Sequence, residues 1–367
     1  MKILYVAHGH YWGATWPYAF IDNFIIRALK NLGHEVQVYE MFSQAEKYKD
    51  FVSKLAKERN LNQAQILAVF DDRASLALPE MAAQFQPDLI LHIVGRIGSN
   101  ALKLLRQLKL KTAIWFLDDP QEILKTAQMS LLYDYIFTVE SQCLPAYQEV
   151  GTKNAYFLPL ACEPEIDKTI VVPDQYKSDI CFIGVCFPRR LQFFDEIADF
   201  LKRYKVKIIG GGKNIGSRAD PWLWQRKLKR LDVLKDFILD EIVNPEEAAK
   251  YYNGAKINLN IHRAPQDERF TGQHNIAPTG VSGRTFEIAG CGAFQLIDNL
   301  RDDYNRHFKV GKEIISFTDL EDFKSKVAYY LAHDAERQQI AQSAQRRAYD
   351  DHTYEKRLEY LLAQCQV

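Results

Sequence analysis

The segment from Ser282 to Phe294 holds the residues whose types and spacing most clearly indicate chemistry. It reads Ser-Gly-Arg-Thr-Phe-Glu-Ile-Ala-Gly-Cys-Gly-Ala-Phe, which predicts a short helix capped by Ser282 and ended by Gly-Cys-Gly. The amino end of a helix attracts anions, because its unpaired amides and its dipole both present positive charge. We therefore expect the amides of Gly283, Arg284 and Thr285, with the Arg284 side chain, to bind a diphosphate.

Glu287 lies one turn inside this predicted helix. From that position its carboxylate is placed to accept hydrogen bonds from the two hydroxyls of a ribose. A diphosphate next to a diol describes a nucleotide-sugar site. The structural alternative is that Glu287 is solvated or pairs with Arg284, since residues three apart on a helix are neighbours.

Arg189 and Arg190 follow a predicted strand that leads into Gly184. A guanidinium donates two parallel hydrogen bonds to phosphate, whereas a positive charge at a helix start opposes the helix dipole. A phosphate role and an ordinary solvated helix start are therefore both open, and we include Gly184, Arg189 and Arg190 in the predicted donor site. A glycine run at 210–212 indicates either close approach of the backbone to a ligand or a turn.

Asn258, Asn260 and His262 alternate along another predicted strand and share one of its faces. Polar side chains in a buried strand need hydrogen-bond partners. A structural network and contact with a donor sugar explain these three residues equally well. We include His262 in the predicted donor site.

His8, His10 and Asp118 follow predicted strands in the first half of the chain. The carboxyl ends of parallel strands carry ligand-binding residues, so we expect these side chains to act on an acceptor hydroxyl as base or ligand; an ordinary polar loop is the alternative for the histidines. Asp119 precedes Pro120 and suits a helix cap, which leaves Asp118 free for chemistry. His8 and His10 have no evident third ligand, and we expect no metal.

Size and composition favour a two-domain enzyme. The chain has 367 residues, and its 47 lysines and arginines balance 47 aspartates and glutamates, so no net charge favours nucleic acid. Six cysteines without paired spacing are typical of reduced thiols. No apolar stretch has the length of a membrane span. We expect a cytoplasmic protein.

Apolar strand patterns alternate with helical patterns in two successive series. This alternation predicts an α/β protein with two Rossmann-like domains that face a cleft. We place an acceptor-side domain at 1–168 and a nucleotide-sugar-binding domain at 169–340. The helical pattern at 341–367 is predicted to pack back on the first domain.

The chain resembles the CgeB-like (spore maturation) glycosyltransferases of the GT-B fold. The likeness rests on Trp-Phe-Leu-Asp-Asp-Pro at 115–120, Phe-Leu-Pro-Leu-Ala at 157–161, Phe-Ile-Gly at 182–184 with Arg189-Arg190, and Arg-Thr-Phe-Glu at 284–287 with Gly-Cys-Gly at 290–292. It implies transfer of a hexose from a nucleoside diphosphate sugar to an acceptor hydroxyl, without metal or other cofactor and with retention favoured. The acceptor is a glycan, a protein or a small molecule.

Thr279 departs from the pattern of related retaining enzymes, which have a second acid eight residues before the equivalent of Glu287. This departure changes the expected contact with the hydroxyls of the donor sugar. Two rival functions fit the same residues. One is a nucleotide-sugar epimerase of the same fold, and the other is a non-catalytic sugar or coat-assembly protein, which Thr279 favours.

Overall fold

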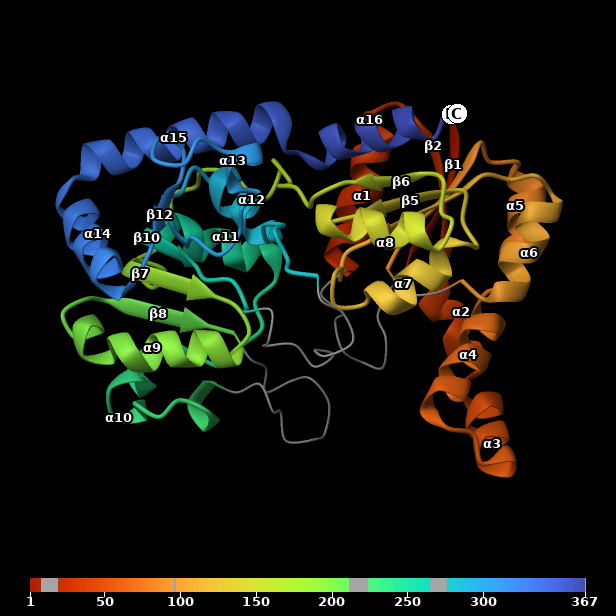
Figure 1. The fold of residues 1–367 in the computed structure, drawn as a ribbon, viewed down its shortest axis with the longest axis horizontal. Helices are drawn as coiled ribbons and strands as arrows, with labels where there is room; N and C mark the ends of the chain where they lie inside the picture. The colour runs from red at the N-terminus through yellow and green to blue at the C-terminus, as the bar shows by residue number, and fades with distance from the viewer. Residues whose placement is uncertain (8–18, 95–96, 211–223, 265–275, 367) are drawn as a thin grey trace. The chain divides into compact units, whose positions relative to one another are not determined.

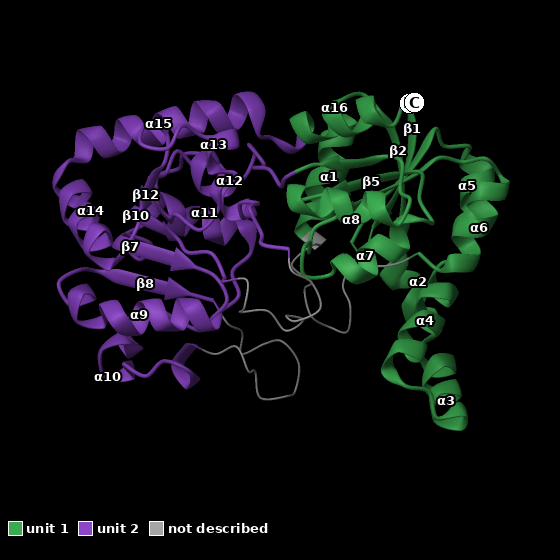
Figure 2. Cartoon of the chain, in the orientation of Figure 1, with its two compact units in different colours: residues 1–158, 355–367 green, residues 159–354 purple. Residues whose placement is uncertain are grey.

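The computed structural model describes residues 1–7, 19–94, 97–210, 224–264 and 276–366. These residues form two compact units, shown in Figure 2. Unit 1 consists of Met1–Leu158 with Glu355–Val367, and unit 2 is Pro159–Tyr354. The chain therefore passes from unit 1 to unit 2 ten residues before the boundary that we placed after residue 168, and it returns after residue 354 rather than at residue 341.

Unit 1 is built on six parallel strands in the order β2-β1-β3-β4-β5-β6. The strands are β1 (Lys2–Ala7), β2 (Glu35–Glu40), β3 (Leu89–Ile93), β4 (Thr112–Phe116), β5 (Tyr135–Thr138) and β6 (Ala155–Phe157). The helices are α1 (Ala19–Asn31), α2 (Met41–Lys47), α3 (Lys49–Arg59), α4 (Gln63–Ala74), α5 (Leu78–Phe85), α6 (Ser99–Gln107), α7 (Ile123–Ser130), η1 (Ser141–Cys143), α8 (Leu144–Glu149) and α16 (Tyr354–Gln364). Within unit 1, α3 and α4 extend away from the sheet (Figure 1).

Unit 2 repeats this plan with six parallel strands in the order β12-β11-β10-β7-β8-β9. The strands are β7 (Ser178–Ile183), β8 (Val206–Ile209), β9 (Ile238–Leu239), β10 (Ala255–Asn260), β11 (Gln295–Asp298) and β12 (Ile315–Phe317). The helices are α9 (Pro188–Leu201), η2 (Trp224–Arg226), α10 (Leu231–Leu234), η3 (Lys235–Phe237), α11 (Pro245–Gly254), α12 (Gly283–Gly290), α13 (Tyr304–His307), α14 (Leu320–Ala332) and α15 (Asp334–Asp351). The prediction of two parallel α/β sheets is confirmed.

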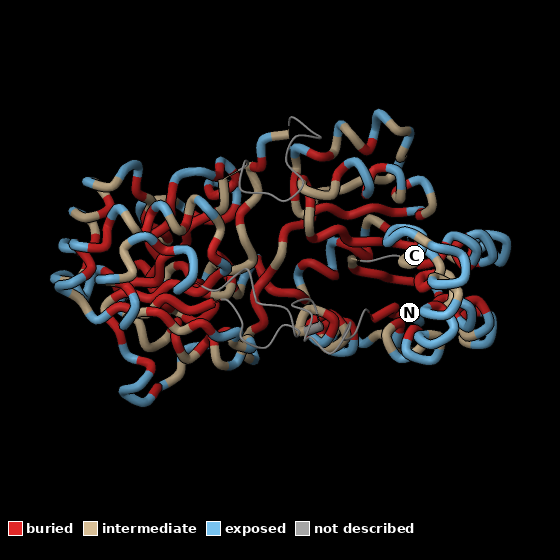
Figure 3. The backbone as a smooth tube through the Cα atoms, turned by 90° about the horizontal axis from the view of Figure 1, so that it is seen from below, coloured by how far each residue is buried: buried red, intermediate tan, exposed pale blue. Residues whose placement is uncertain are grey.

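The inner strands of both sheets are mostly apolar and buried, as parallel strands covered on both faces must be. β3 and β4 are buried at every position, and Figure 3 shows buried backbone running through the middle of each unit. In unit 2 the aromatic rings of Phe182, Phe194 and Trp224 meet edge to face between β7 and α9. Such edge-to-face pairs add to the stability that burial supplies.

The order of strands in unit 2 reverses between β7 and β10. From β7 the chain adds β8 and β9 on one side, and it then returns to add β10, β11 and β12 on the other. Open parallel sheets bind ligands outside the carboxyl ends of the strands at such a reversal. The ends of β7 and β10 are therefore the place in unit 2 where a ligand is expected.

All six cysteines are buried and none forms a disulfide. Among the helices that the structure describes, none combines the length and the apolar content that a membrane crossing requires. The cytoplasmic location stays a prediction.

Candidate functional site

The predicted donor residues of unit 2 gather where β7, β10 and β11 end. Gly184 follows β7, His262 follows β10, and α12 begins at Gly283. β7 and β11 are the hydrogen-bonded neighbours of β10 on its two sides, so these segments share one edge of the sheet. Asp298, the last residue of β11, lies at the same edge.

The amino end of α12 is close to the prediction. Ser282 is the N-cap residue with an extended backbone, but its hydroxyl donates to Asn260 Oδ1 (3.2 Å) and makes no cap bond. The Thr285 amide donates to the Ser282 carbonyl (3.0 Å), which closes the first turn. Within the described ranges, the amides of Gly283 and Arg284 have no hydrogen-bond partner. Two of the three predicted amides are therefore available to a ligand.

Thr285 is the first correction to the predicted site. Its side chain is fully buried and its hydroxyl accepts from Asn260 Nδ2 (2.9 Å), while Gln295 Nε2 donates to its carbonyl (3.0 Å). Position 285 faces the sheet because it lies one turn from the buried residues Ile288 and Ala289. Thr285 thus fastens α12 to β10 and β11 and does not face a ligand.

His262 is the second correction, because both of its ring nitrogens are occupied. Nδ1 lies 3.1 Å from Asp298 Oδ1 and 3.1 Å from the Tyr304 hydroxyl, and Nε2 accepts from the Ser282 amide (3.2 Å). The ring is 4% exposed, and burial lowers its pKa. The structural network that was the alternative explanation for His262 is the one that the structure contains.

Arg189 belongs to the same network. Its Nη1 donates to Asp298 Oδ2 (2.6 Å) and to the His262 carbonyl (2.9 Å), and Asp298 Oδ2 also accepts from the His262 amide (2.7 Å). Burial raises the pKa of Asp298, but His262 and Arg189 together outweigh it and hold that pKa at about 2. Arg189 therefore neutralises the buried carboxylate of Asp298. Its position in the sequence does not reveal this ion pair.

Asn258 and Asn260 also serve the framework. Asn258 Nδ2 donates to the carbonyls of Tyr252 (3.0 Å) and Phe294 (3.3 Å), and the Asn260 side chain contacts Ser282 and Thr285 as described above. Their amides link β10 to α11, β11 and α12. The side-chain nitrogens of this polar face thus have partners in neighbouring segments, whereas Asn258 Oδ1 is buried without a hydrogen-bond partner among the described residues.

Two guanidinium groups converge beside Gly184. Arg190 is 6% exposed and donates to the carbonyls of Ile261 (2.8 Å) and Val185 (3.0 Å). The guanidinium carbons of Arg190 and Arg284 lie 5.4 and 6.0 Å from the centroid of the Phe182 ring. A Cβ on Gly184 would lie 2.9 Å from Phe182 Cζ and 3.1 Å from Arg190 Nη1, so a larger residue there would displace these side chains. Positive charge is concentrated at the strand reversal.

Glu287 is half-buried and reaches back towards the amino end of α12. Its Oε2 accepts from the Tyr252 hydroxyl (3.3 Å), and its Oε1 lies 3.4 Å from where a Cβ on Gly283 would be. Within the described part of the chain, Arg284 forms no ion pair with it. Burial raises the pKa of Glu287, and the charge of Arg284 opposes that rise only in part. The carboxylate therefore lies beside the amides of Gly283 and Arg284, in the position expected of a residue that binds a ribose.

Asp167 lies behind Glu287 and was missed by sequence reasoning. It is 5% exposed and its Oδ2 accepts from the Glu163 amide (2.8 Å). Burial, followed by the charge of Glu287, raises the pKa of Asp167 well above its usual range. No local pattern could identify it, because the two acids are 120 positions apart in the chain.

The predicted acceptor residues belong to unit 1. His8 and His10 lie outside the described residues. Asp118 is half-buried and lies two residues after the carboxyl end of β4. The interpretation of Asp119 as a helix cap is wrong, because α7 begins only at Ile123 with Glu122 as its N-cap.

Asp119 instead fills a buried polar site. Its carboxylate accepts hydrogen bonds from the hydroxyls of Thr126 (2.9 Å), Thr138 (2.6 Å) and Tyr147 (2.6 Å). Burial outweighs these bonds and raises the pKa of Asp119 to about 6. The three hydroxyls pin the turn that carries Asp118.

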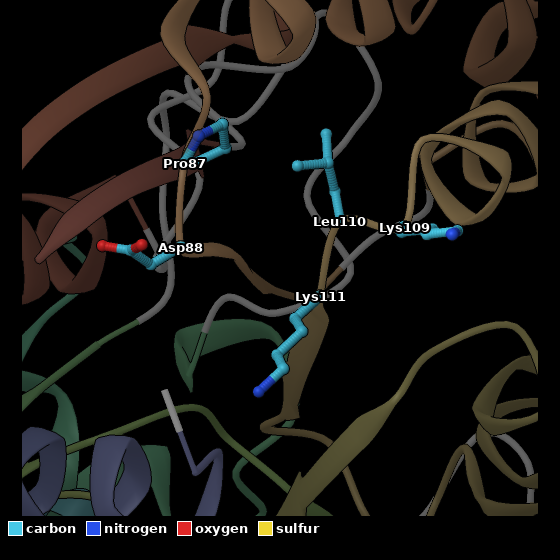
Figure 4. A pocket seen from close by; sticks show the side chains of 5 residues that line it. All are labelled: Pro87, Asp88, Lys109, Leu110 and Lys111. Carbon is cyan, nitrogen blue, oxygen red and sulfur yellow. The ribbon is translucent and has the colours of Figure 1, made fainter.

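A surface hollow in unit 1 does not coincide with any predicted site. Its volume is about 280 Å³, and Figure 4 shows the side chains that line it. They are Pro87, Asp88, Lys109, Leu110 and Lys111. These residues precede β3 and β4, so the hollow lies at the amino ends of the strands, opposite the edge where parallel sheets bind ligands.

Comparison with known proteins identifies the family of the chain. A family model described as glycosyl transferase-like matches residues 189–363, which include most of α9 and all of β10 and α12. The spore protein CgeB of Bacillus subtilis (strain 168) is 33% identical over 260 residues, which are 70% of this chain and 76% of that protein. The chain belongs to the CgeB-like glycosyltransferase family. The resemblance seen in the sequence is confirmed.

Solved structures share the fold of this CgeB-like chain at low identity. A glycosyltransferase from Rickettsia africae is 11% identical with a TM-score of 0.64, covering 100% of this chain and 97% of that one. HepE from Anabaena, solved in complex with UDP-glucose, is 12% identical with a TM-score of 0.58, covering 99% and 100%. The CgeB-like chain therefore has the GT-B fold.

Proposed function

We propose that this CgeB-like protein transfers a sugar from a nucleoside diphosphate donor to an acceptor hydroxyl. One observation carries the proposal. The amides of Gly283 and Arg284, which have no hydrogen-bond partner among the described residues, lie with the guanidinium of Arg284 and the carboxylate of Glu287 on α12, at the strand reversal of unit 2. An anion site next to a hydroxyl-binding acid matches a nucleotide. HepE, which shares the fold, was solved with UDP-glucose.

The donor's diphosphate would bind the amino end of α12. Backbone amides and the helix dipole favour an anion there, and Arg284 adds a planar hydrogen-bond donor. Arg190 contributes through its charge, since its Nε and Nη1 are already bonded to carbonyls. Glu287 would accept hydrogen bonds from the ribose.

The chemical step requires stabilisation of a leaving group. As the bond between the anomeric carbon and the diphosphate oxygen breaks, negative charge builds up on the diphosphate. Fixed amides and guanidinium groups stabilise such charge without reorganisation, which is a large contribution to catalysis. These groups supply the positive charge that a metal ion provides elsewhere, so the proposed transfer is metal-independent.

The acceptor hydroxyl would lose its proton to a side chain of unit 1. Asp118 is the proposed base because it follows β4 at a carboxyl end, and His8 and His10 are the other candidates. The family likeness favours hexose transfer with retention. The proton spectrum of the product decides this point, because the coupling of its anomeric proton differs between the two anomers.

A thermal-shift screen with UDP, GDP, ADP, CDP and dTDP, with and without EDTA, tests the donor site. It is followed by chromatography of the matching nucleotide sugars incubated with the protein. Stabilisation in EDTA with release of the free nucleoside diphosphate supports metal-independent transfer. Conversion to an isomeric sugar nucleotide identifies an epimerase instead, and the absence of any shift favours a non-catalytic protein.

A further inference from the structure

The contacts of His262 determine where its proton lies. A backbone N–H can only donate, so Nε2 must accept from the Ser282 amide, 3.2 Å away, and carries no hydrogen. The hydrogen is then on Nδ1, where Asp298 Oδ1 accepts it at 3.1 Å. Arg189 and the His262 amide hold the other carboxylate oxygen, which fixes the orientation of Asp298.

We infer that Asp298 and His262 form a relay that positions the amino end of α12 for the donor diphosphate. Asp298 selects the Nδ1–H tautomer, and Nε2 then anchors the N-cap residue Ser282. The next two amides in the chain are those of Gly283 and Arg284, which have no hydrogen-bond partner among the described residues. Both relay residues are positioning residues, since neither is exposed enough to contact the donor.

The inference rests on the proposed donor site but adds a condition to it. Hydrogen-bond donors act on a ligand only when they are held at the right distance and angle. Ser282 has no side-chain cap bond to the helix, so the imidazole anchors the N-cap residue from outside. Without the Nε2 acceptor, the amides of Gly283 and Arg284 would still be available as donors, but they would no longer be held in position.

The relay makes donor binding sensitive to acid. Protonation puts a hydrogen on Nε2, which then opposes the Ser282 N–H as a second donor. The groups around the ring are Asp298 and Tyr304, with Arg301 and Arg190 further off. Burial outweighs the carboxylate and lowers the pKa of His262 below its usual 6.5. The neutral, binding-competent ring is therefore present at neutral pH and is lost only below pH 6.5.

The first test reads the tautomer in the full-length protein without any ligand. Nitrogen-15 spectra of labelled histidine, with His262 assigned from its loss in His262→Gln, should show a protonated Nδ1 and a bare Nε2 at pH 8. The Ser282 amide should exchange slowly with solvent in the wild type and in His262→Gln, and faster in His262→Ala. A hydrogen on Nε2, or equal exchange in all three proteins, overturns the relay.

The second test uses the nucleoside diphosphate that gives the largest thermal shift. Glutamine places an amide oxygen near the position of Nε2 and does not titrate, so His262→Gln should bind within about threefold of the wild type at pH 8. His262→Ala should bind roughly tenfold more weakly, the effect of losing one buried hydrogen bond. The exposed His333→Gln is the matched control and should bind as the wild type does.

Calorimetry from pH 8 down to pH 5 completes the test. Below pH 6.5 the wild type should lose affinity relative to His262→Gln, and titration of the nucleotide itself cancels in this comparison. Parallel profiles, or wild-type affinity in His262→Ala, overturn the relay. If no nucleoside diphosphate binds at pH 8, the proposed function fails, and the tautomer and the exchange of the Ser282 amide still decide whether the relay exists.

Discussion

Glu287 meets two opposing requirements. A carboxylate that accepts hydrogen bonds from ribose hydroxyls works best when it is ionised, whereas burial raises the pKa of Glu287. The charge of Glu287 in turn raises the pKa of Asp167. Arg284 and the Tyr252 hydroxyl favour the ionised form. The proton therefore belongs on Asp167, the more deeply buried acid, and the charge on Glu287.

We predict that Glu287→Gln weakens nucleotide binding by about 1–3 kcal/mol, because charge-assisted hydrogen bonds to the ribose become neutral ones. Isothermal titration calorimetry at pH 8 measures the change. Glu196→Gln, on the exposed face of α9, is the matched control and should leave affinity unchanged. Equal affinity in the two variants would exclude Glu287 from the site.

Asp167→Asn should stabilise the protein at neutral pH and not in acid. The pKa of Asp167 is raised by burial and by Glu287, so the folded state favours the neutral acid. Its stability contribution is complete below the unfolded value of about 3.8 and declines as pH rises. Asparagine stays neutral and its side-chain oxygen can still accept from the Glu163 amide.

The melting temperatures of Asp167→Asn and the wild type should therefore agree near pH 4 and differ by a few degrees at pH 8, with the variant higher. Asp174→Asn provides the contrast, because Lys177 lowers the pKa of this exposed acid. That variant should gain nothing at pH 8. A lower melting temperature for Asp167→Asn at pH 8 contradicts the assignment of the proton.

The sequence singles out the proposed donor residues on α12 more readily than the buried residues around them. Glu287 and Arg284 are identifiable because they lie within one turn of a recognisable helix start. Asp298, Tyr252 and Asp167 are not, since each meets the site from a distant segment. The role of Arg189 could not be predicted for the same reason, because its partner, Asp298, is 109 positions away.

At the scale of elements, the two glycines of α12 should have separable effects. A Cβ on Gly283 would press on Leu160 Cδ1 (3.0 Å) and Glu287 Oε1 (3.4 Å), both ends of movable side chains. A Cβ on Gly290 would meet Asp167 Cβ (2.9 Å) and the Asp167 carbonyl (3.1 Å), which cannot move aside. Helix propensity favours alanine equally at both positions.

Gly283→Ala should therefore weaken nucleotide binding by roughly three- to tenfold, a cost of about 0.7–1.4 kcal/mol, with little change in melting temperature. Gly290→Ala should lower the melting temperature by several degrees, since overpacking costs about 1–3 kcal/mol. Calorimetry and thermal melts on the same preparations separate the two effects. The reverse pattern would mean that Glu287 does not share the ligand-binding end of α12.

Gly210 holds the carboxyl ends of β7 and β8 together. A Cβ there would lie 2.0 Å from the Gly184 carbonyl, and its φ is +142°. Gly151 also has a positive φ (+95°) but open space around it. Gly151→Ala should cost about 1–2 kcal/mol of backbone strain, while Gly210→Ala should cost over about 3 kcal/mol. Urea unfolding followed by circular dichroism measures both, and equal losses would contradict the close approach.

The periodicity of the sequence predicted which segments form helices and strands. Local signals did not always predict which residues cap the helices. α12 begins after Ser282 as predicted, because Ser-Gly and Gly-Cys-Gly delimit it. α7 begins four residues after Asp119, because three hydroxyls from other segments compete for that carboxylate. A capping signal in the sequence cannot show that the same side chain forms hydrogen bonds with residues distant in the sequence.

For the whole molecule, we predict that a bound nucleoside diphosphate protects unit 2. Ligands stabilise the state that they bind, and every proposed donor residue belongs to Pro159–Tyr354. Hydrogen exchange read by mass spectrometry, without acceptor, should show slower exchange in peptides covering 180–190, 256–264 and 280–292. Peptides from 112–139 serve as the internal control. Protection confined to the control would move the nucleotide to unit 1.

The two-sheet fold was predictable because parallel strands are apolar throughout and alternate with helices. The boundaries between the compact units were harder to predict from the sequence. Pro159–Lys168 reads as a continuation of the first series, but Cys162 pairs with Thr353 in an isolated bridge, and its amide donates to the His352 carbonyl (2.9 Å). Contacts of this separation leave no local mark in the sequence.

The return of the chain to unit 1 affects the order of folding during synthesis. Leu358 and Leu361 of α16 are fully buried, and Glu355 accepts from Asn31 Nδ2 (2.9 Å), so this helix completes the interior that the first 158 residues begin. A ribosome must therefore make all of unit 2 before unit 1 can close. Until then the nascent chain exposes an apolar surface, which a chaperone that binds such surfaces would protect from aggregation.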